Sequence, residues 1–216
     1  MSDPLVFYTN PMSRGRIVRW MLEEVGEPYE TVVLDYATTM KGSDYLAINP
    51  MGKVPAIRHG DTVVTEGAAI CAYLADMFPD RGLAPPSKSK LRGPYYRWLF
   101  FAAGPLEAAV TAKALGLLAP ADKSTMAGYG TFEDTIEALE TAVKPGPYIC
   151  GDQFTAADLY VGSHIGWGMQ FGTIEKRPAF EDYVARIHAR PAAARAAEID
   201  DALIPEQQPA NPQPAA

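Results

Sequence analysis

Residues 49–70, NPMGKVPAIRHGDTVVTEGAAI, contain the turns and strands that decide the fold. Two short segments, 54–58 and 62–65, carry the apolar and β-branched residues of strands and flank His-Gly-Asp at 59–61, which is typical of a hairpin turn. Apolar residues at helical spacing follow between 70 and 77. We therefore predict a β-hairpin that leads directly into a helix.

The residues before this stretch extend the same unit. Residues 5–8 are an apolar strand, and residues 17–25 place their apolar positions on one helical face. Gly26 is typical of a helix C-terminus, and residues 29–34 predict a second strand. Strand, helix and strand in about 30 residues indicate a right-handed βαβ unit. With a short helix at 42–48, the order predicts a small mixed sheet with helices on its faces.

The chain changes character after residue 80. A segment rich in proline, glycine and charge indicates a linker, and no convincing strand follows it. The predicted helices span 88–118, 122–144, 156–170, 178–189 and 191–200. We therefore expect an α/β domain at 1–80, a linker at 81–88, an all-helical domain at 89–204 and a flexible, Pro-rich tail at 205–216.

Composition excludes several function classes. The 216 residues include 19 basic and 26 acidic side chains, so a net charge of −7 argues against nucleic acid as a partner. Two cysteines indicate thiols in a reducing, cytoplasmic compartment. We expect no signal peptide, no membrane segment and no metal site, because the three histidines have no ligand spacing with the cysteines. No P-loop or dinucleotide motif occurs.

Val54-Pro55 has two interpretations. A proline that starts a strand often marks an edge strand, where its missing N–H is tolerated. Alternatively, a cis peptide bond would turn the Val54 backbone outward, where its N–H and C=O could pair with an extended peptide ligand. Spacing alone leaves both open.

Glu66-Gly67 lies where a strand ends and a helix starts. Such a terminus attracts anions, so a ligand carboxylate could bind the Gly67 N–H while Glu66 receives an ammonium group. The simpler interpretation is an acidic residue that stabilises the first helical turn.

Ser13 lies in the loop between the first strand and the first helix. A lone serine there is commonly a helix cap, while the functional alternative aims its hydroxyl at an anionic sulfur. Thr155 and Asp158 have the spacing of a capping box, which predicts a folding role.

The ordered set of these motifs resembles the cytosolic glutathione transferase superfamily, in a bacterial style, from residue 5 to about 202. The resemblance includes Asn10-Pro11-x-Ser13-Arg14, the segment 49–55, the segment 66–74, the box at 154–158 and Arg177-Pro178. It implies a thioredoxin-like N-terminal domain, an all-helical C-terminal domain and a homodimer.

The resemblance also implies a glutathione site between the domains. Val54 would pair its backbone with the cysteinyl part of glutathione ahead of a cis Pro55, and Glu66 with the Gly67 N–H would hold the γ-glutamyl end. Lys53 or Lys41 would meet the glycyl carboxylate. The family usually has Ser or Thr at the Gly67 position, so this chain lacks a side-chain hydroxyl there and keeps the backbone donor.

For the catalytic group, Ser13 matches the family's serine-type pattern best, with Tyr8 and Asn10 as reserves. The loop contains no cysteine, which argues against a mixed-disulfide mechanism. The hydroxyl would stabilise the glutathione thiolate, which is the nucleophile. The residues suggested for the neighbouring apolar pocket are Met12, Tyr96, Phe100 and Trp167.

The implied activity is detoxifying: glutathione conjugation to small hydrophobic electrophiles, together with peroxide reduction. One alternative is a catalytically silent glutathione-binding or protein-interaction module of the same fold. Another is a glutathione-dependent isomerase, dehalogenase or ether-cleaving enzyme.

Overall fold

The computed structural model describes residues 3–204, and its N-terminal part is built on a four-stranded sheet. The strands are β1 (Leu5–Thr9), β2 (Glu30–Val33), β3 (Ala56–His59) and β4 (Thr62–Thr65), in the spatial order β2-β1-β3-β4. β1 pairs in parallel with β2 and antiparallel with β3. All five residues of β1 are buried, as a central strand requires. The predicted mixed sheet is confirmed.

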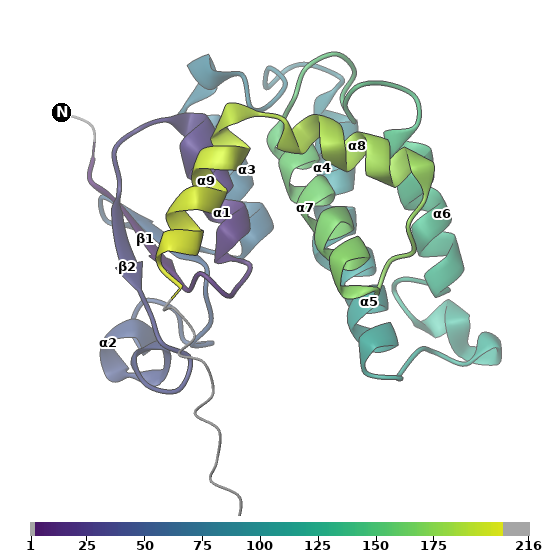
Figure 1. The fold of residues 1–216 in the computed structure, drawn as a ribbon, viewed down its shortest axis with the longest axis horizontal. Helices are drawn as coiled ribbons and strands as arrows, with labels where there is room; N and C mark the ends of the chain where they lie inside the picture. Colours follow the sequence, from purple (N-terminus) through teal and green to yellow (C-terminus); the bar gives the residue numbers. More distant parts are fainter. Residues whose placement is uncertain (1–2, 205–216) are drawn as a thin grey trace, which may run out of the picture.

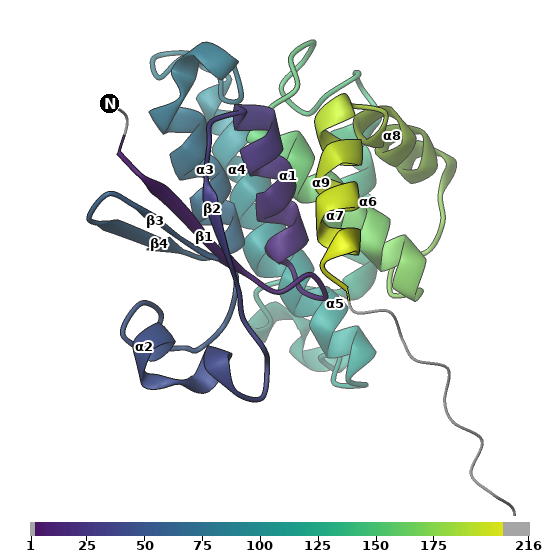
Figure 2. The same ribbon diagram turned by 60° about the vertical axis from the view of Figure 1, so that its left-hand side comes forward.

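Two helices, α1 (Gly15–Val25) and α3 (Gly67–Met77), pack on one face of this sheet (Figures 1 and 2). Phe7 and Ile57 point from β1 and β3 into the core that these helices complete. The opposite face carries Tyr8, which packs against the segment that contains a 3₁₀ turn (Thr39–Lys41) and the short helix α2 (Ser43–Leu46). A second 3₁₀ turn (Pro79–Arg81) follows α3.

The C-terminal part of the described chain is helical, as predicted, but two predicted helices are divided. The helices are α4 (Arg92–Phe101), α5 (Glu107–Ala114), α6 (Phe132–Val143), α7 (Ala156–Phe171), α8 (Pro178–His188) and α9 (Pro191–Ala202). The residues 88–118 do not form one continuous helix as predicted, because a π-helical turn that contains Pro105 separates α4 from α5. Proline has no N–H to donate, so the regular helical hydrogen bonding is interrupted there. The prediction for 122–144 splits into a 3₁₀ turn (Ala121–Met126) and α6, with Gly130 at positive φ between them.

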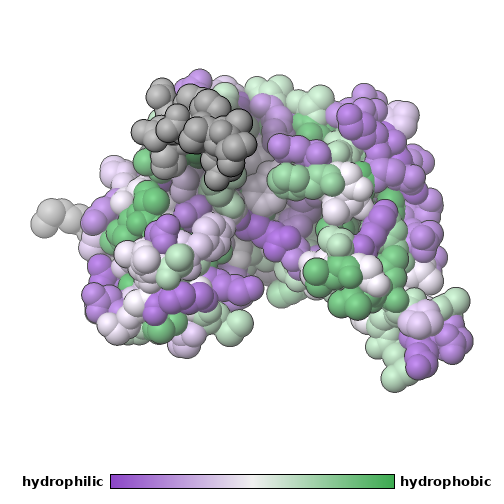
Figure 3. All heavy atoms as spheres, turned by 60° about the horizontal axis from the view of Figure 1, so that its bottom comes forward, coloured by the Kyte–Doolittle hydropathy of each residue, from purple (hydrophilic) through white to green (hydrophobic). Residues whose placement is uncertain are grey.

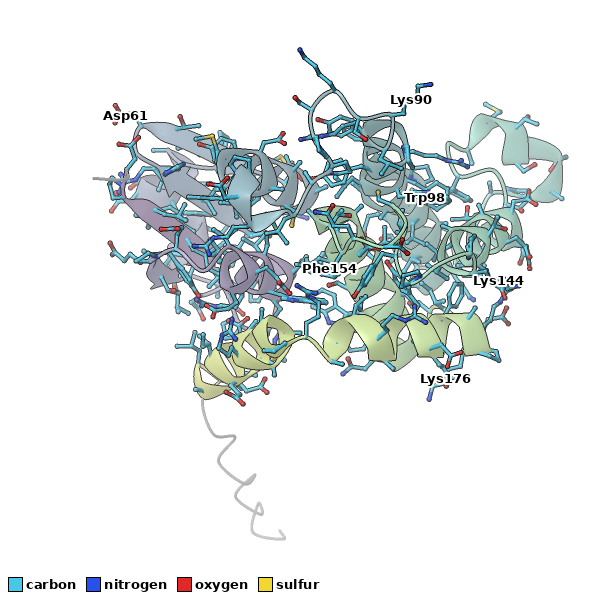
Figure 4. The ribbon with its side chains drawn as sticks, turned by 90° about the horizontal axis from the view of Figure 1, so that it is seen from above. Asp61, Lys90, Trp98, Lys144, Phe154 and Lys176 are labelled. Carbon is cyan, nitrogen blue, oxygen red and sulfur yellow. The ribbon has the colours of Figure 1, made fainter. Side chains whose placement is uncertain are left out.

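The last helix joins the two parts. α9 lies beside α1 (Figure 1), where Arg190 forms a two-pronged ion pair with Glu24 at 2.6 and 2.7 Å. Figure 4 places Phe154 at this junction, and its ring stacks on Trp20 at 6.0 Å between centroids. The Arg190 guanidinium lies 3.9 Å from the Phe154 ring centre. These contacts fix the sheet domain against the helices and therefore fix the space between them.

The capping box at the start of α7 is confirmed. The fully buried Asp158 carboxylate accepts hydrogen bonds from the Thr155 N–H and hydroxyl, the Ile149 N–H and the Tyr183 hydroxyl, all at 2.7–2.8 Å. Asp158 therefore stabilises the packing of α7 against its surroundings.

Within residues 3–204, no helix has the length and apolarity needed to cross a membrane, and no group of three metal-ligating side chains lies together. The predicted tail, 205–216, lies outside the described residues.

Candidate active site

A cleft of about 890 Å³ opens between the sheet domain and the helical part, and Figure 3 looks into this hollow. The sheet side contributes the loop after β1 and residues near the start of β3. The helical side contributes one face each of α5 and α7. The lining includes Pro11, Met12, Ser13, Arg14, Arg16, Tyr36, Lys41, Gly52, Lys53, Val54, Val110, Thr111, Ala114, Leu115, His164, Trp167, Phe171 and Asp201.

Val54 presents an unpaired backbone to this cleft. The predicted cis bond between Val54 and Pro55 is confirmed. Within the described chain, the N–H and C=O of Val54 form no hydrogen bond, whereas the preceding carbonyl of Lys53 accepts from Tyr45 at 2.6 Å and Asn49 at 2.8 Å. A free donor and acceptor on one residue are what an extended peptide needs to pair as an added strand.

Glu66 is the only described residue other than glycine with a positive φ, at φ 66° and ψ 118°. It immediately precedes Gly67, the first residue of α3, and its side chain is exposed and has no ion-pair partner among residues 3–204. Such a conformation costs about 1–2 kcal/mol and persists where the surroundings or a function require it. Neither Glu66 nor Gly67 lines the 890 Å³ cleft.

Two lysines give the sheet side of the cleft positive charge. The Lys41 ammonium donates to the Gly52 carbonyl at 2.6 Å and to the Met51 carbonyl at 3.3 Å. Gly52 has φ 56°, and a Cβ there would lie 3.0 Å from Lys41 Nζ, so the turn needs glycine. Lys53 is exposed and lines the same cleft. Both ammonium groups are placed to attract a ligand carboxylate.

The three candidates for the catalytic group differ in where their side chains lie. Ser13 lines the cleft, and its hydroxyl donates to the Asn10 carbonyl at 2.7 Å and accepts from the Gly15 N–H at 2.9 Å. Asn10 uses its side chain within the backbone of the loop, donating to Leu34 and accepting from Met12. Tyr8 points to the opposite face of the sheet. Of these candidates, Ser13 alone faces the cleft.

Sequence analysis missed a polar cluster at the floor of the cleft. Arg14 pairs with Glu107 at 2.7 Å, and Glu107 lies 3.8 Å from Nδ1 of His164. The His164 side chain is 7% exposed, and its Nε2 has no hydrogen-bond partner in the described chain. Burial lowers the pKa of His164 to about 3, so the ring is neutral near pH 7.

The apolar wall of the cleft differs in part from the predicted pocket. Met12 and Trp167 line it, whereas Tyr96 and Phe100 do not. These two rings lie 6.3 Å apart on an outer face of α4, with Phe100 70% exposed. The wall is completed by Val110, Ala114, Leu115 and Phe171. Trp167 and Phe171 are four positions apart, as are Val110 and Ala114, and this spacing places each pair on one face of its helix. The sequence therefore contained a signal for these residues of the wall.

Comparisons with known proteins agree with this geometry. The family model described as glutathione S-transferase, N-terminal domain, matches residues 12–77, and the corresponding C-terminal domain model matches residues 107–186. The chain is 32% identical to glutathione S-transferase GstA of Escherichia coli O157:H7, over 86% of this chain and 90% of that protein.

Solved structures give the same result. A glutathione transferase from Methylococcus capsulatus superposes with a TM-score of 0.76 at 29% identity, covering 93% of this chain and all of that one. A glutathione transferase homologue from Sulfitobacter with bound glutathione gives 0.71 at 27% identity, covering 94% of this chain and all of that one. The thioredoxin-like sheet, the helical partner domain and both matching family models show that this chain is a transferase of the glutathione S-transferase family.

Proposed function

We propose that the protein transfers the thiolate of glutathione to small hydrophobic electrophiles. One observation carries the proposal: the unpaired backbone of Val54 opens on the same cleft as the Ser13 hydroxyl and the apolar wall around Trp167. A tripeptide thiol held at Val54 would place its sulfur beside a hydroxyl and an apolar substrate. Such an arrangement supports a detoxifying conjugation.

Glutathione would bind along the sheet side. Its cysteinyl backbone pairs with the N–H and C=O of Val54, which Pro55 turns toward the cleft. Glu66 receives the γ-glutamyl ammonium, and the Gly67 N–H with the α3 dipole receives the adjacent carboxylate. Lys41 and Lys53 attract the glycyl carboxylate at the other end. Each charged end of the tripeptide then meets an opposite charge or a free donor.

Ser13 activates the thiol in this proposal. A free thiol titrates near about pH 8.5, and its thiolate is the nucleophile. When the thiolate is present, the Ser13 hydroxyl turns from the Asn10 carbonyl to the sulfur, because a hydrogen bond to an anion is stronger than one to a neutral carbonyl. The thiol proton leaves to solvent, the sulfur forms a bond to the electrophilic carbon, and the leaving group departs with its electron pair.

Peroxide reduction uses the same thiolate. The sulfur attacks one peroxide oxygen, the O–O bond breaks, and the released alkoxide takes a proton from water to become an alcohol. The glutathione sulfenic acid that remains condenses with a second glutathione to give the disulfide and water. This chemistry needs no group beyond those already placed for conjugation.

We also propose a homodimer in a reducing, cytoplasmic environment. Tyr96 and Phe100 form an exposed aromatic pair on α4 outside the cleft, and a second copy of the chain is the occupant that family membership favours. Both cysteines are buried free thiols. Light scattering should give twice the chain mass, and Phe100→Glu should shift it toward one chain mass. A single-chain mass for the unaltered protein would contradict the dimer.

The function is tested with a glutathione-affinity column followed by a conjugation assay with an aryl halide. Retention on the column, elution by free glutathione and turnover of the aryl halide are expected. Retention without turnover of aryl halides, other electrophiles or hydroperoxides would favour the silent binding module instead. Failure to bind glutathione would contradict both.

A further inference from the structure

Arg14 brings a guanidinium with free donors to the floor of the cleft. It directly follows Ser13 in the chain, and its side chain lines the cleft and is 47% exposed. Its Nη2 pairs with Glu107 at 2.7 Å, while its Nε and Nη1 form no hydrogen bond with any of residues 3–204. Because a guanidinium has five N–H donors, Arg14 can bind a ligand while it holds Glu107.

His164 on α7 lines the cleft beside this ion pair, and neither of its ring nitrogens has a hydrogen-bond partner in the described chain. Nδ1 lies 3.8 Å from Oε2 of Glu107, which exceeds a hydrogen-bond length, and Nε2 is fully buried. Burial lowers the pKa of His164 to about 3, so the neutral ring carries one N–H. A proton on Nε2 would be a buried donor without an acceptor, so it is more stable on Nδ1, which is accessible from the cleft.

The charge of the cleft favours a ligand atom that becomes negative. Among residues 3–204, the charged residues of its lining are four basic and one acidic: Arg14, Arg16, Lys41, Lys53 and Asp201. Asp201 is paired with Arg16, and Glu107 is compensated by Arg14. The whole chain, by contrast, has a net charge of −7. Positive charge is therefore concentrated in the cleft, where it stabilises negative charge that develops during a reaction.

Apolar side chains lie one helical turn away from these donors. Trp167 follows His164 by three positions on α7, Val110 follows Glu107 by three positions on α5, and both line the cleft. An electrophile with an oxygen at its reacting end and an apolar remainder therefore meets donors and an apolar wall at once. An α,β-unsaturated ketone or aldehyde with an alkyl chain has this chemistry.

We propose that Arg14 and the Nδ1–H of His164 bind the carbonyl oxygen of an α,β-unsaturated ketone or aldehyde while glutathione adds to it. The thiolate forms a bond to the β-carbon, the electron pair of the C=C bond moves to give an enolate, and negative charge develops on the bound oxygen. The enolate then takes a proton from water at its α-carbon. Donors fixed where the charge develops stabilise this transition state. Resting on the proposed function, this assignment makes Arg14 and His164 catalytic residues for one class of electrophile.

The test compares two electrophiles, trans-3-nonen-2-one, which has the carbonyl oxygen, and benzyl chloride, which has no oxygen. Both react with the same thiolate, so any effect on thiol ionisation or glutathione binding cancels in the ratio of their kcat/KM values. Arg14→Met and His164→Leu each remove a donor and should lower the ratio of ketone to chloride by about 10-fold or more. Arg14→Lys keeps a charged donor and should stay within about 3-fold of the unaltered protein.

Arg186→Met is the matched control, because it removes the same charged group from α8 outside the cleft, where the guanidinium donates to the Pro147 carbonyl at 3.0 Å. Both kcat/KM values should be unchanged. An unchanged ratio in Arg14→Met or in His164→Leu would overturn the proposal, as would equal losses for the two electrophiles. If the unaltered protein turns over benzyl chloride and not the ketone, the proposed function stands and the carbonyl pocket is wrong. If it turns over neither, the proposed function fails, and the role of Arg14 and His164 fails with it.

Discussion

Arg19 of α1 and Asp200 of α9 form an ion pair at 3.1 Å with both side chains 1% exposed. Arg19 also donates to the hydroxyls of Tyr29 and Thr31, at 2.9 and 2.8 Å. The pair joins the first helix of the sheet domain to the last helix of the chain. Because the cleft lies between the sheet domain and the helical part, its width depends on the packing of α9 against α1.

Asp200→Ala should therefore destabilise the protein by about 3–5 kcal/mol, because it leaves the Arg19 guanidinium buried without a counter-charge. Asp200→Asn keeps a hydrogen-bond acceptor and should cost less. Asp201→Ala removes a neighbouring carboxylate that is 64% exposed, and its effect should stay below about 1 kcal/mol. Denaturant unfolding measures all three, and equal losses for Asp200→Ala and Asp201→Ala would contradict the assignment.

Ser13→Ala should lower turnover at neutral pH by about 10- to 100-fold, since it removes the hydrogen bond proposed between Ser13 and the charged sulfur. The Michaelis constant for glutathione should change much less, because the contacts proposed for Val54 and Glu66 with the peptide are unaltered. Tyr8→Phe, on the other face of the sheet, serves as the control and should keep full activity. Steady-state kinetics with an aryl halide measure the turnover number and the Michaelis constant for glutathione separately. Full activity in Ser13→Ala would show that a group other than Ser13 activates the thiol.

Glu66→Gly separates strain from function at the strand-to-helix corner. Glycine adopts φ 66° without steric cost, so the free energy of unfolding should stay unchanged or rise by up to about 1 kcal/mol. The affinity for glutathione should fall by about 10-fold or more, because the acceptor proposed for the ammonium of the ligand is lost. Thermal unfolding and calorimetric titration of one preparation give both quantities. A less stable variant with intact affinity would show that Glu66 serves the fold alone.

His164 should make the protein less stable in mild acid. Its folded pKa is lowered to about 3 by burial, so below its ordinary value near 6.5 the unfolded chain binds a proton that the folded chain does not. The resulting loss between about pH 6.5 and pH 5 is about 2 kcal/mol. His164→Gln should remove that part of the pH dependence, while His188, whose pKa burial also lowers, contributes equally to both proteins. Parallel pH profiles for the two proteins would refute a neutral, buried His164.

Much of the fold could be predicted because local signals agreed with the tertiary structure. Gly26 at φ 70° ends α1, and the turn at 59–61 joins β3 to β4, as their sequences indicate. The division of 88–118 was missed, because Pro105 lies inside an otherwise helical apolar pattern and a π-helical turn accommodates it there. The apolar pattern of a sequence does not show how a helix accommodates the backbone N–H that a proline lacks.

The candidate site was predictable where one short segment carries the geometry, as at Val54-Pro55. It was not predictable where side chains from distant elements meet. Glu107 and His164 are 57 positions apart in sequence and come together only through the packing of α5 and α7. Tyr96 and Phe100 were assigned to the pocket because they are aromatic, and hydrophobicity alone does not distinguish the cleft face of a helix from its outer face.

The ionisation of bound glutathione tests the central claim, that this cleft holds the tripeptide with its sulfur as a thiolate. The ultraviolet absorbance of the thiolate is followed against pH in the complex, with a Ser13→Ala complex alongside. We predict half-ionisation at least one pH unit below the value near about 8.5 of a free thiol, and a value closer to it in Ser13→Ala. A bound thiol that ionises at the same pH as free glutathione would contradict the account.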